Sequence, residues 1–346
     1  MKGVFLFLIG LFCGVVGYVS IISRLLLQFS PAQPCTTTTD TTNHHHHHAT
    51  TPSRFHSRLR FVMVVGLEGT GHHFMGQIAK HAPPLMTTLK ELGLIRELRI
   101  LQKSLFDHFH PTQGLWNAHC ALRNATTINM ATLQDTVVQQ LAAMEQQYTQ
   151  QQKSTATSVI HVPLNTAFDQ RGVGMMSYPN FYGNCRKLNY PSLELLYRAC
   201  DLAQVDCGHV YLDRSPSALL YSTTRNRQLG SGSLAESLHL YKSMYHIVES
   251  QLRAFASRTW GCFELFHNDN NNNNNNQQQQ LGQLWGYPSD REFSSFWNQT
   301  YKPPQPVPPN WIPPSMEPSF DAVQQAHQRV WRVCQQAYRG TLRDDD

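Results

Sequence analysis

Three glycines follow a short apolar run and precede two histidines, a combination that could bind an anion. The segment RFVMVVGLEGTGHHF, residues 60–74, places Gly66, Gly69 and Gly71 in the turn. Glycines allow positive φ and let the backbone approach a ligand closely. The N–H groups at the start of a following helix favour negative charge. The turn therefore predicts a phosphate-binding site.

The residues after the third glycine argue against ordinary nucleotide hydrolysis. Gly66 and Gly71 have the glycine spacing of the P-loop pattern GxxxxGK[ST], in which Lys contacts phosphate and the hydroxyl binds magnesium. His72 and His73 occupy those two positions. A kinase or NTPase would lose both functions, and the segment lacks the dinucleotide pattern GxGxxG.

A second segment, VYLDRSPSALLYS, carries an arginine where a strand is expected to end. Arg214 precedes Pro216, and Ser222 follows on the expected helix. A planar guanidinium and a hydroxyl can together clasp a dianionic phosphate. The segment resembles the 3′-phosphate-binding segment of the sulfotransferases, in which Arg, Pro and Ser have this arrangement. An ion pair of Arg214 with Asp213 or Asp201 is the alternative.

The first turn is similar to the 5′-phosphosulfate-binding loop of the same family. Aligned on Gly71, the family's Ser falls at Thr70 and its two Thr residues at His72 and His73. The family's basic residue falls at Gly69, so the cation that stabilises the departing phosphosulfate is missing from its usual place. We expect either a histidine or another basic side chain to supply it.

The resemblance implies a metal-independent transfer of a sulfuryl group from 3′-phosphoadenosine-5′-phosphosulfate (PAPS) to a hydroxyl or amine of a glycan or secreted protein. The residues that it assigns to the co-substrate are Gly66, Gly69, Thr70, Gly71, His72, His73, Arg214 and Ser222. The reaction needs a base, for which Glu68, His72 and His73 are candidates. We favour a histidine, because its pKa lies near neutrality. Both histidines could instead cap or pack the helix start.

Two other functions stay open. One is a catalytically silent nucleotide-binding relative, because the basic residue is missing at position 69. The other is a P-loop kinase or glycosyltransferase of the secretory pathway, which would be expected to carry an acidic metal-binding motif such as D-x-D.

The elements that must position these residues alternate along the chain. Short apolar runs predict buried strands at 61–65, 158–162 and 209–212. Helical spacing and Pro signals predict helices at 72–82, 135–151, 191–203, from 216, 233–256 and 320–338. This order predicts an α/β fold, a three-layer P-loop-like parallel sheet flanked by helices, with both turns at the ends of neighbouring strands.

Three segments are too polar or too rich in Pro for a core. Residues 28–54 are expected to form a low-complexity stem, and residues 268–280, an Asn/Gln run, a disordered surface loop. Residues 301–318 are expected to be extended polyproline. The folded, sulfotransferase-like domain then covers residues 55–346.

The N-terminus predicts a membrane anchor. Val4 to Ile22 contains 19 residues without a charge, close to the ~20 that cross a bilayer as a helix. Residues 1–27 are thus expected to form a cytoplasmic tip and a transmembrane signal anchor, with a cleaved signal peptide as the alternative. The sequons at Asn124 and Asn298 fit a lumenal domain, so a single-pass type II protein of the Golgi membrane is predicted.

The cysteines and the composition narrow the remaining possibilities. Six cysteines in the domain permit three disulfides, whose pairing stays open. The absence of a CxxC pair argues against structural zinc. A net charge of +5 suits an anionic ligand, but without a Lys/Arg cluster along a helix we expect no nucleic-acid partner.

Overall fold

The computed structural model describes residues 55, 57–67, 69–109, 134–151, 159–165, 180–181, 188–189, 193–227, 234–265, 273–301 and 306–342. All of them belong to one compact unit, Ala49–Asp346. The predicted anchor, the whole predicted stem, Glu68, and the cysteines at 120 and 185 lie outside the described residues. Within these ranges no helix combines the length and the apolar character needed to cross a membrane.

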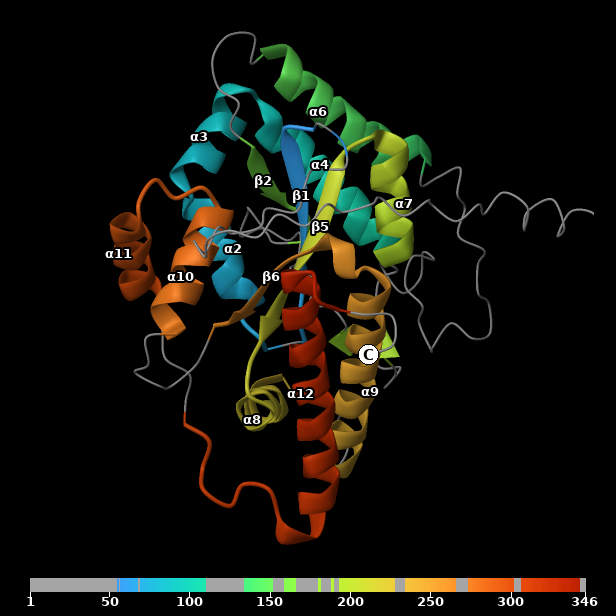
Figure 1. Cartoon of the computed structure of the whole chain (residues 1–346), viewed down its shortest axis with the longest axis vertical. Coiled ribbons are helices and arrows are strands. Elements are labelled where there is room, and N and C mark those ends of the chain that lie inside the picture. The colour runs from blue at the N-terminus through green and yellow to red at the C-terminus, as the bar shows by residue number, and fades with distance from the viewer. Residues whose placement is uncertain are drawn as a thin grey trace, which may run out of the picture. The chain divides into compact units, whose positions relative to one another are not determined.

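A four-stranded parallel sheet forms the centre of the domain (Figure 1). Its order is β2-β1-β5-β6, with β1 at Leu59–Val65, β2 at Ile160–Pro163, β5 at Asp206–Asp213 and β6 at Thr259–Glu264. Neighbouring strands pair Val65 with Tyr211 and Asp213 with Glu264. The carboxyl ends of β1, β5 and β6 therefore lie at one edge. A separate antiparallel pair joins β3 (Asn180–Phe181) to β4 (Leu188–Asn189).

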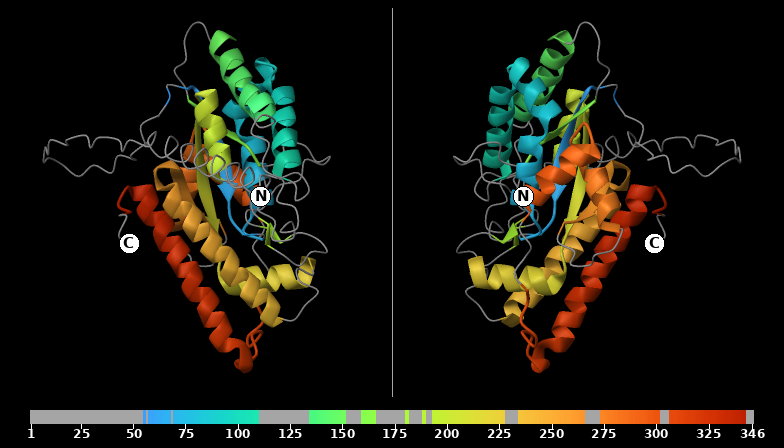
Figure 2. Two further views of the ribbon diagram at one scale, coloured as in Figure 1. Left: turned by 90° about the vertical axis from the view of Figure 1, so that its right-hand side faces the viewer. Right: turned by 90° about the vertical axis from the view of Figure 1, so that its left-hand side faces the viewer.

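Helices flank the sheet, as the predicted α/β class requires. Those before β5 are α2 (His72–His81), α3 (Pro83–Glu91), α4 (Leu94–Phe109), a π-helical turn at Gln134–Val138, α6 (Gln139–Gln151) and α7 (Leu193–Ala203). Those after it are α8 (Pro216–Arg227), α9 (Leu234–Ala254), α10 (Asn273–Leu284), α11 (Asp290–Thr300) and α12 (Glu317–Arg339), with 3₁₀ turns at Ala256–Arg258 and Pro314–Met316. Figure 2 shows α9 and α12 running side by side.

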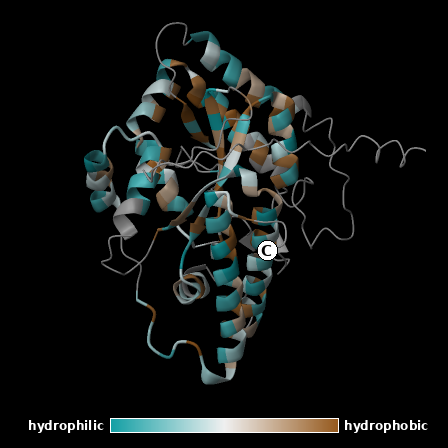
Figure 3. Ribbon diagram, viewed as in Figure 1, coloured by the Kyte–Doolittle hydropathy of each residue, from teal (hydrophilic) through white to brown (hydrophobic). Residues whose placement is uncertain are grey.

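The apolar residues of the strands form the centre of the core. Figure 3 shows hydrophobic residues concentrated in the strands, while α12 turns hydrophilic residues toward the viewer. All eight residues of β5 are buried, including His209, which is 0% exposed. Its ring nitrogens lie 2.5 Å from the Tyr197 hydroxyl and 2.9 Å from the Thr259 hydroxyl. A polar side chain is tolerated in this central strand because both of its nitrogens have a partner.

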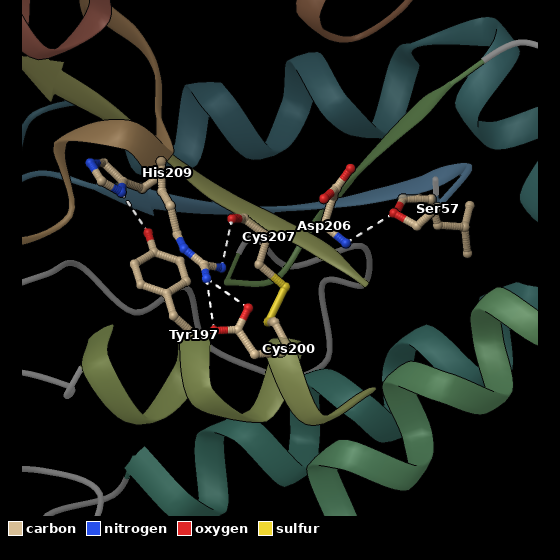
Figure 4. Close-up of a disulfide and its surroundings, with 9 residues drawn as sticks. Ser57, Tyr197, Cys200, Asp206, Cys207 and His209 are labelled. Atoms are coloured by element: carbon tan, nitrogen blue, oxygen red, sulfur yellow. Dashed lines mark hydrogen bonds and ion pairs between the residues drawn. A yellow bond between two sulfur atoms is a disulfide. The ribbon is translucent and has the colours of Figure 1, made fainter. Parts of the chain in front are cut away.

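Two disulfides tie helices to the sheet. Cys200 of α7 bonds Cys207 of β5, and Cys262 of β6 bonds Cys334 of α12. Figure 4 shows the first of them beside the contact of Tyr197 with His209. The sequence permitted disulfides without fixing their pairing, and the structure supplies these two pairs.

The polar run predicted as a loop differs from that expectation. Residues 273–280 form the first two turns of α10 instead. The Gln277 side chain accepts a hydrogen bond from the Glu264 backbone N–H at 3.0 Å, and Leu281 is buried one turn later. Docking against the end of β6 thus stabilises a helix whose Asn-rich start has low intrinsic propensity.

The segment predicted as polyproline also differs in part. Residues 306–313 form neither helix nor strand, but they are not continuously extended, because a turn at 309–310 places Asn310 at φ +61°. A 3₁₀ turn then begins at Pro314, and α12 already starts at Glu317. Pro318 lies in the first turn of α12, where its missing N–H costs nothing.

Candidate anion-binding site at the ends of β1 and β5

The two turns meet at the carboxyl edge of the sheet. β1 and β5 are parallel neighbours, and each turn directly follows its strand. The chain passes from β1 to β2 on one side and later to β5 on the other, so the strand order reverses between β1 and β5. Ligands of open parallel sheets bind outside the carboxyl ends of the strands at such a reversal. The location is therefore suited to a binding site.

The first turn needs its glycines for steric reasons. A Cβ on Gly66 would lie 2.6 Å from the Thr70 hydroxyl oxygen and 2.8 Å from the Leu212 carbonyl oxygen. Gly69 and Gly71 have φ values of +94° and +113°, which favour glycine. Gly71 is the N-cap of α2, where no side chain of the described residues bonds the helix start. The first N–H groups of α2 therefore face the turn as an anion site requires.

Thr70 and His72 lie inside the turn. The Thr70 hydroxyl donates to the Leu67 carbonyl at 2.7 Å and lies 3.3 Å from Nδ1 of His72. Burial lowers the pKa of His72 to about 4, although the Val64 carbonyl raises it. The His72 side chain is thus neutral at pH 7, and it cannot supply the cation that the turn lacks.

His73 occupies the opposite environment. It is exposed on the first turn of α2, and partial burial lowers its pKa from the usual value. A neutral, accessible imidazole can accept a proton. Of the three predicted base candidates, His73 is accessible, His72 is buried, and Glu68 lies outside the described residues.

Arg214 connects the second turn to the first. Its Nη1 donates a hydrogen bond of 2.9 Å to the carbonyl oxygen of Gly69. Burial lowers the pKa of Arg214, whereas Tyr301 and Tyr241 raise it, and a guanidinium stays protonated at neutral pH. The alternative ion pairs are not formed, because Asp213 bonds His327 and Asp201 bonds Arg258. The charge of Arg214 is therefore placed at the first turn.

This contact bears on the cation missing at position 69. Beyond its positive φ, a Cβ on Gly69 would lie 3.1 Å from both Cδ1 of Leu219 and Cγ2 of Thr223 on α8. The site thus has little room for a basic side chain growing from residue 69. Arg214 brings a guanidinium to the same residue from the neighbouring strand.

On α8, which follows the second turn, it is Thr223 and not Ser222 that packs against the first turn. Ser222 is half-buried on α8, whereas Thr223 is 1% exposed and packs against Gly69. The Thr223 hydroxyl donates to the Leu219 carbonyl at 2.9 Å and accepts from Tyr241 at 2.7 Å. The sequence could have indicated Thr223, because it lies four residues after the apolar Leu219. Residues at this spacing lie on the same face of a helix.

A small pocket lined in part by Tyr301 was missed by the sequence reasoning. It encloses about 90 Å³ beyond the end of β6, and its lining includes Glu264, Gln277, Gln278, Trp297 and Tyr301. Tyr301 also lies close enough to Arg214 for that cation to lower its pKa, although burial raises the pKa overall. The ring of Tyr301 meets that of Phe74, on the first turn of α2, at 5.8 Å. Tyr301 thus links the pocket to the start of α2 through Phe74.

A second polar pair lies behind Arg214. Nε2 of His327, on α12, lies 2.8 Å from both carboxylate oxygens of Asp213, which also accepts from Tyr211 at 3.1 Å. Burial lowers the pKa of His327, but the hydrogen bond to Asp213 and the charges of Asp213 and Glu264 outweigh it, so the pKa is raised. This pair fixes α12 against the ends of β5 and β6.

Comparisons with known proteins assign no family to this chain. No family model matches the chain, and neither a curated protein nor a solved structure matches it. In the part of the chain that the structure describes, no three His, Cys, Asp or Glu side chains are grouped to hold a metal ion.

Proposed function

We propose that this chain is a sulfotransferase that moves a sulfuryl group from PAPS to a hydroxyl or amine of a glycan or secreted protein. The observation that carries the proposal is the 2.9 Å hydrogen bond from Arg214 to the Gly69 carbonyl. It joins the two segments that resemble the phosphosulfate and 3′-phosphate sites of that family. A single molecule with two phosphoryl groups can then be held by both turns.

The residues present fit such a ligand. The close approach of the backbone at Gly66, where a Cβ would lie 2.6 Å from the Thr70 hydroxyl, is typical of a turn that surrounds a phosphoryl group. The N–H groups at the start of α2 can donate to the phosphosulfate. The guanidinium of Arg214, which the resemblance assigns to the 3′-phosphate, also brings positive charge to the first turn through its contact with Gly69. Arg214 therefore takes the role of the basic residue that is absent at position 69.

The proton has a place in this arrangement. In the reaction the acceptor oxygen or nitrogen bonds to sulfur, the bond from sulfur to the 5′-phosphate oxygen breaks, and the acceptor proton passes to a base. His73 is exposed at the start of α2 and its pKa is lowered by partial burial, so it is neutral and can accept that proton. We assign the base to His73.

The compartment is part of the same proposal. The two disulfides support folding in an oxidising compartment, and Asn298 of the second sequon is exposed on α11. Together with the apolar segment at the N-terminus, they support a type II membrane protein of the Golgi with a lumenal domain.

The test is binding of 3′-phosphoadenosine-5′-phosphate (PAP), the product nucleotide, to the full chain. PAP should stabilise the protein in a thermal-shift assay, and ATP should not. Arg214→Ala should weaken PAP binding by about 2 kcal/mol, roughly 30-fold, because a charge-assisted contact to phosphate is lost. Arg339→Ala is the matched control, since Arg339 is exposed at the end of α12.

The outcomes separate the possible functions. Absence of any response to PAP would remove the sulfotransferase proposal, and stabilisation by ATP would favour a kinase. If both arginine variants bind PAP like the parent protein, Arg214 is purely structural. PAP binding without transfer of radiolabelled sulfate to mixed glycan acceptors would identify a silent relative.

A further inference from the structure

The pair of Asp213 and His327 lies directly behind Arg214. Asp213 is the last residue of β5 and is 2% exposed, and Arg214 follows it in the chain. Both of its carboxylate oxygens lie 2.8 Å from Nε2 of His327 on α12, and one of them accepts a hydrogen bond from the Tyr211 hydroxyl at 3.1 Å. A buried carboxylate held in this way fixes the end of β5. The backbone from which the Arg214 side chain starts is therefore fixed as well.

A second route leads from His327 to the first turn along α9. The ring of His327 packs against that of Tyr245, with centroids 5.5 Å apart. Tyr241 lies one helical turn before Tyr245 on the same face of α9. Its hydroxyl donates to the Thr223 hydroxyl at 2.7 Å, and a Cβ on Gly69 would lie 3.1 Å from Cγ2 of Thr223. Packed side chains therefore connect His327 to residue 69.

Both routes end at Gly69. Its carbonyl oxygen accepts the hydrogen bond of 2.9 Å from Arg214, and Thr223 lies against its α-carbon. A glycine has no side chain that restricts its backbone. The groups that contact Gly69 therefore determine where its carbonyl lies, and with it the first turn.

We propose that His327 is a positioning residue of the anion site: its pair with Asp213 holds Arg214 against the Gly69 carbonyl and keeps the two turns in the geometry that binds phosphoryl groups. The inference rests on the proposed function for the identity of the ligand, but its claim about the two turns can be tested without a ligand.

The charge of His327 sets the strength of this pair, because an imidazolium donates a stronger hydrogen bond to a carboxylate than a neutral ring does. The titratable and charged groups around it, among the described residues, include Asp213 and Tyr211 of β5, Tyr245 and Glu249 of α9, Glu264 of β6 and Arg329 of α12, which bonds Glu249. Burial lowers the pKa of His327, but Asp213 and Glu264 outweigh it, so the pKa is raised. Anion binding should thus be strongest below the ordinary histidine pKa of about 6.5 and weaken as pH rises through the raised value.

The first experiment compares PAP affinity among the full-length parent protein, His327→Gln and His246→Gln by isothermal titration calorimetry, at a temperature where all three are folded. His327→Gln keeps a neutral donor, so it should bind PAP about fivefold more weakly than the parent at about pH 6. This ratio should fall toward one at about pH 9, where His327 of the parent is neutral too. His246 is the matched control, because it is 48% exposed on α9 and its Nδ1 lies 4.0 Å from a Glu249 carboxylate oxygen. His246→Gln should bind PAP like the parent at both pH values.

The second experiment measures hydrogen exchange of the ligand-free chain. The backbone N–H groups of Thr70 and Met75 are hydrogen-bonded within the first turn and the start of α2, so they exchange faster when the turn opens. At about pH 6 they should exchange about fivefold faster in His327→Gln than in the parent, and at the parent rate in His246→Gln. Val210 is buried in β5 and paired with β1 and β6, so its exchange reports on opening of the whole sheet and should change less.

The outcomes separate this inference from the proposed function. If no variant binds PAP, the proposed function fails, and the exchange rates alone decide the role of His327. Unchanged exchange in the first turn, or an equal increase at Val210, would show that His327 only stabilises the fold and would overturn the inference. A ratio of PAP affinities that does not depend on pH would overturn it as well.

Discussion

Replacing Gly69 with alanine tests the idea that no side chain can grow from this residue. The backbone there has φ +94°, and a left-handed conformation costs a non-glycine residue about 1–2 kcal/mol. The new Cβ would also lie 3.1 Å from Leu219 and Thr223, and overpacking of a filled site costs typically about 1–3 kcal/mol. The lower entropy of the unfolded chain returns about 0.4–1 kcal/mol. We therefore expect Gly69→Ala to destabilise the protein by roughly 1–5 kcal/mol, with a midpoint of about 3 kcal/mol.

The neighbours have little freedom to move away. Leu219 is fully buried, and the Thr223 hydroxyl is bonded to the Leu219 carbonyl and to Tyr241. A shift of residue 69 would also move the carbonyl that accepts the hydrogen bond from Arg214. Gly69→Ala should thus weaken PAP binding as well as stability.

Gly340 provides a matched control for the backbone term. It ends α12 with φ +67° and has nothing within 4 Å of its virtual Cβ, so Gly340→Ala should cost only about 1 kcal/mol. Urea denaturation of both variants gives the two free energies of unfolding. Equal losses in the two variants, with PAP binding intact in both, would show that α8 does not enclose residue 69 and would refute the reasoning about the missing cation.

Two other predictions concern stability. The raised pKa of His327 means that its ion pair with Asp213 stabilises the fold fully below the unfolded pKa of about 6.5 and less as pH rises through the folded pKa. Subtracting the urea stability of His327→Gln from that of the parent should give a difference that shrinks with rising pH, and a constant or growing difference would contradict it. The other prediction compares the two disulfides by the length of chain that each one spans. Cys334→Ser removes a disulfide across 72 residues, and Cys207→Ser removes one across 7. Cys334→Ser should therefore lower the free energy of unfolding, measured in urea, by about 2 kcal/mol more than Cys207→Ser. Equal costs would be the contrary result.

Strands of the sheet could be predicted from the sequence where their residues are apolar. The predicted strands were too short where the observed strands include polar residues. The run at 61–65 predicted most of β1, and the observed strand begins two residues earlier. The strand predicted at 209–212 covers Asp206–Asp213 in the structure. Asp206 belongs to it because it pairs with Arg60 of β1, a partner far away in sequence. Patterns of hydrophobicity cannot show such long-range partners.

Several helices were missed although their spacing carried a signal. The buried residues Leu94, Leu98, Leu101 and Leu105 of α4 recur every three or four positions. The buried pair of α11, Phe293 and Trp297, shows the same spacing, and Ser289 accepts a capping hydrogen bond from the Glu292 backbone N–H. By contrast, α10 was hidden by its Asn/Gln composition, because contacts with β6 rather than propensity stabilise it.

The site illustrates the same division between local and long-range information. Glycine spacing predicted the first turn, and the strand-end arginine predicted the second. The contact of Arg214 with Gly69 depends on the pairing of β1 with β5, which local patterns do not encode. Tyr301 reaches the site from the end of α11, so only the assembled fold places it beside Arg214.

The two adjacent histidines show how one step along a helix separates two roles. Successive helical residues point about 100° apart, so the first side chain can turn inward while the second faces solvent. His72 is buried beside Thr70, with its pKa lowered to about 4, and it fills space beneath the turn as a neutral group. His73 is exposed, so under the proposed function it is the one that would reach an acceptor. Neither has to provide the positive charge, because Arg214 brings it from the neighbouring strand. Under the proposed function, a turn without its own cation would therefore still bind a phosphosulfate, provided that β5 stays paired with β1.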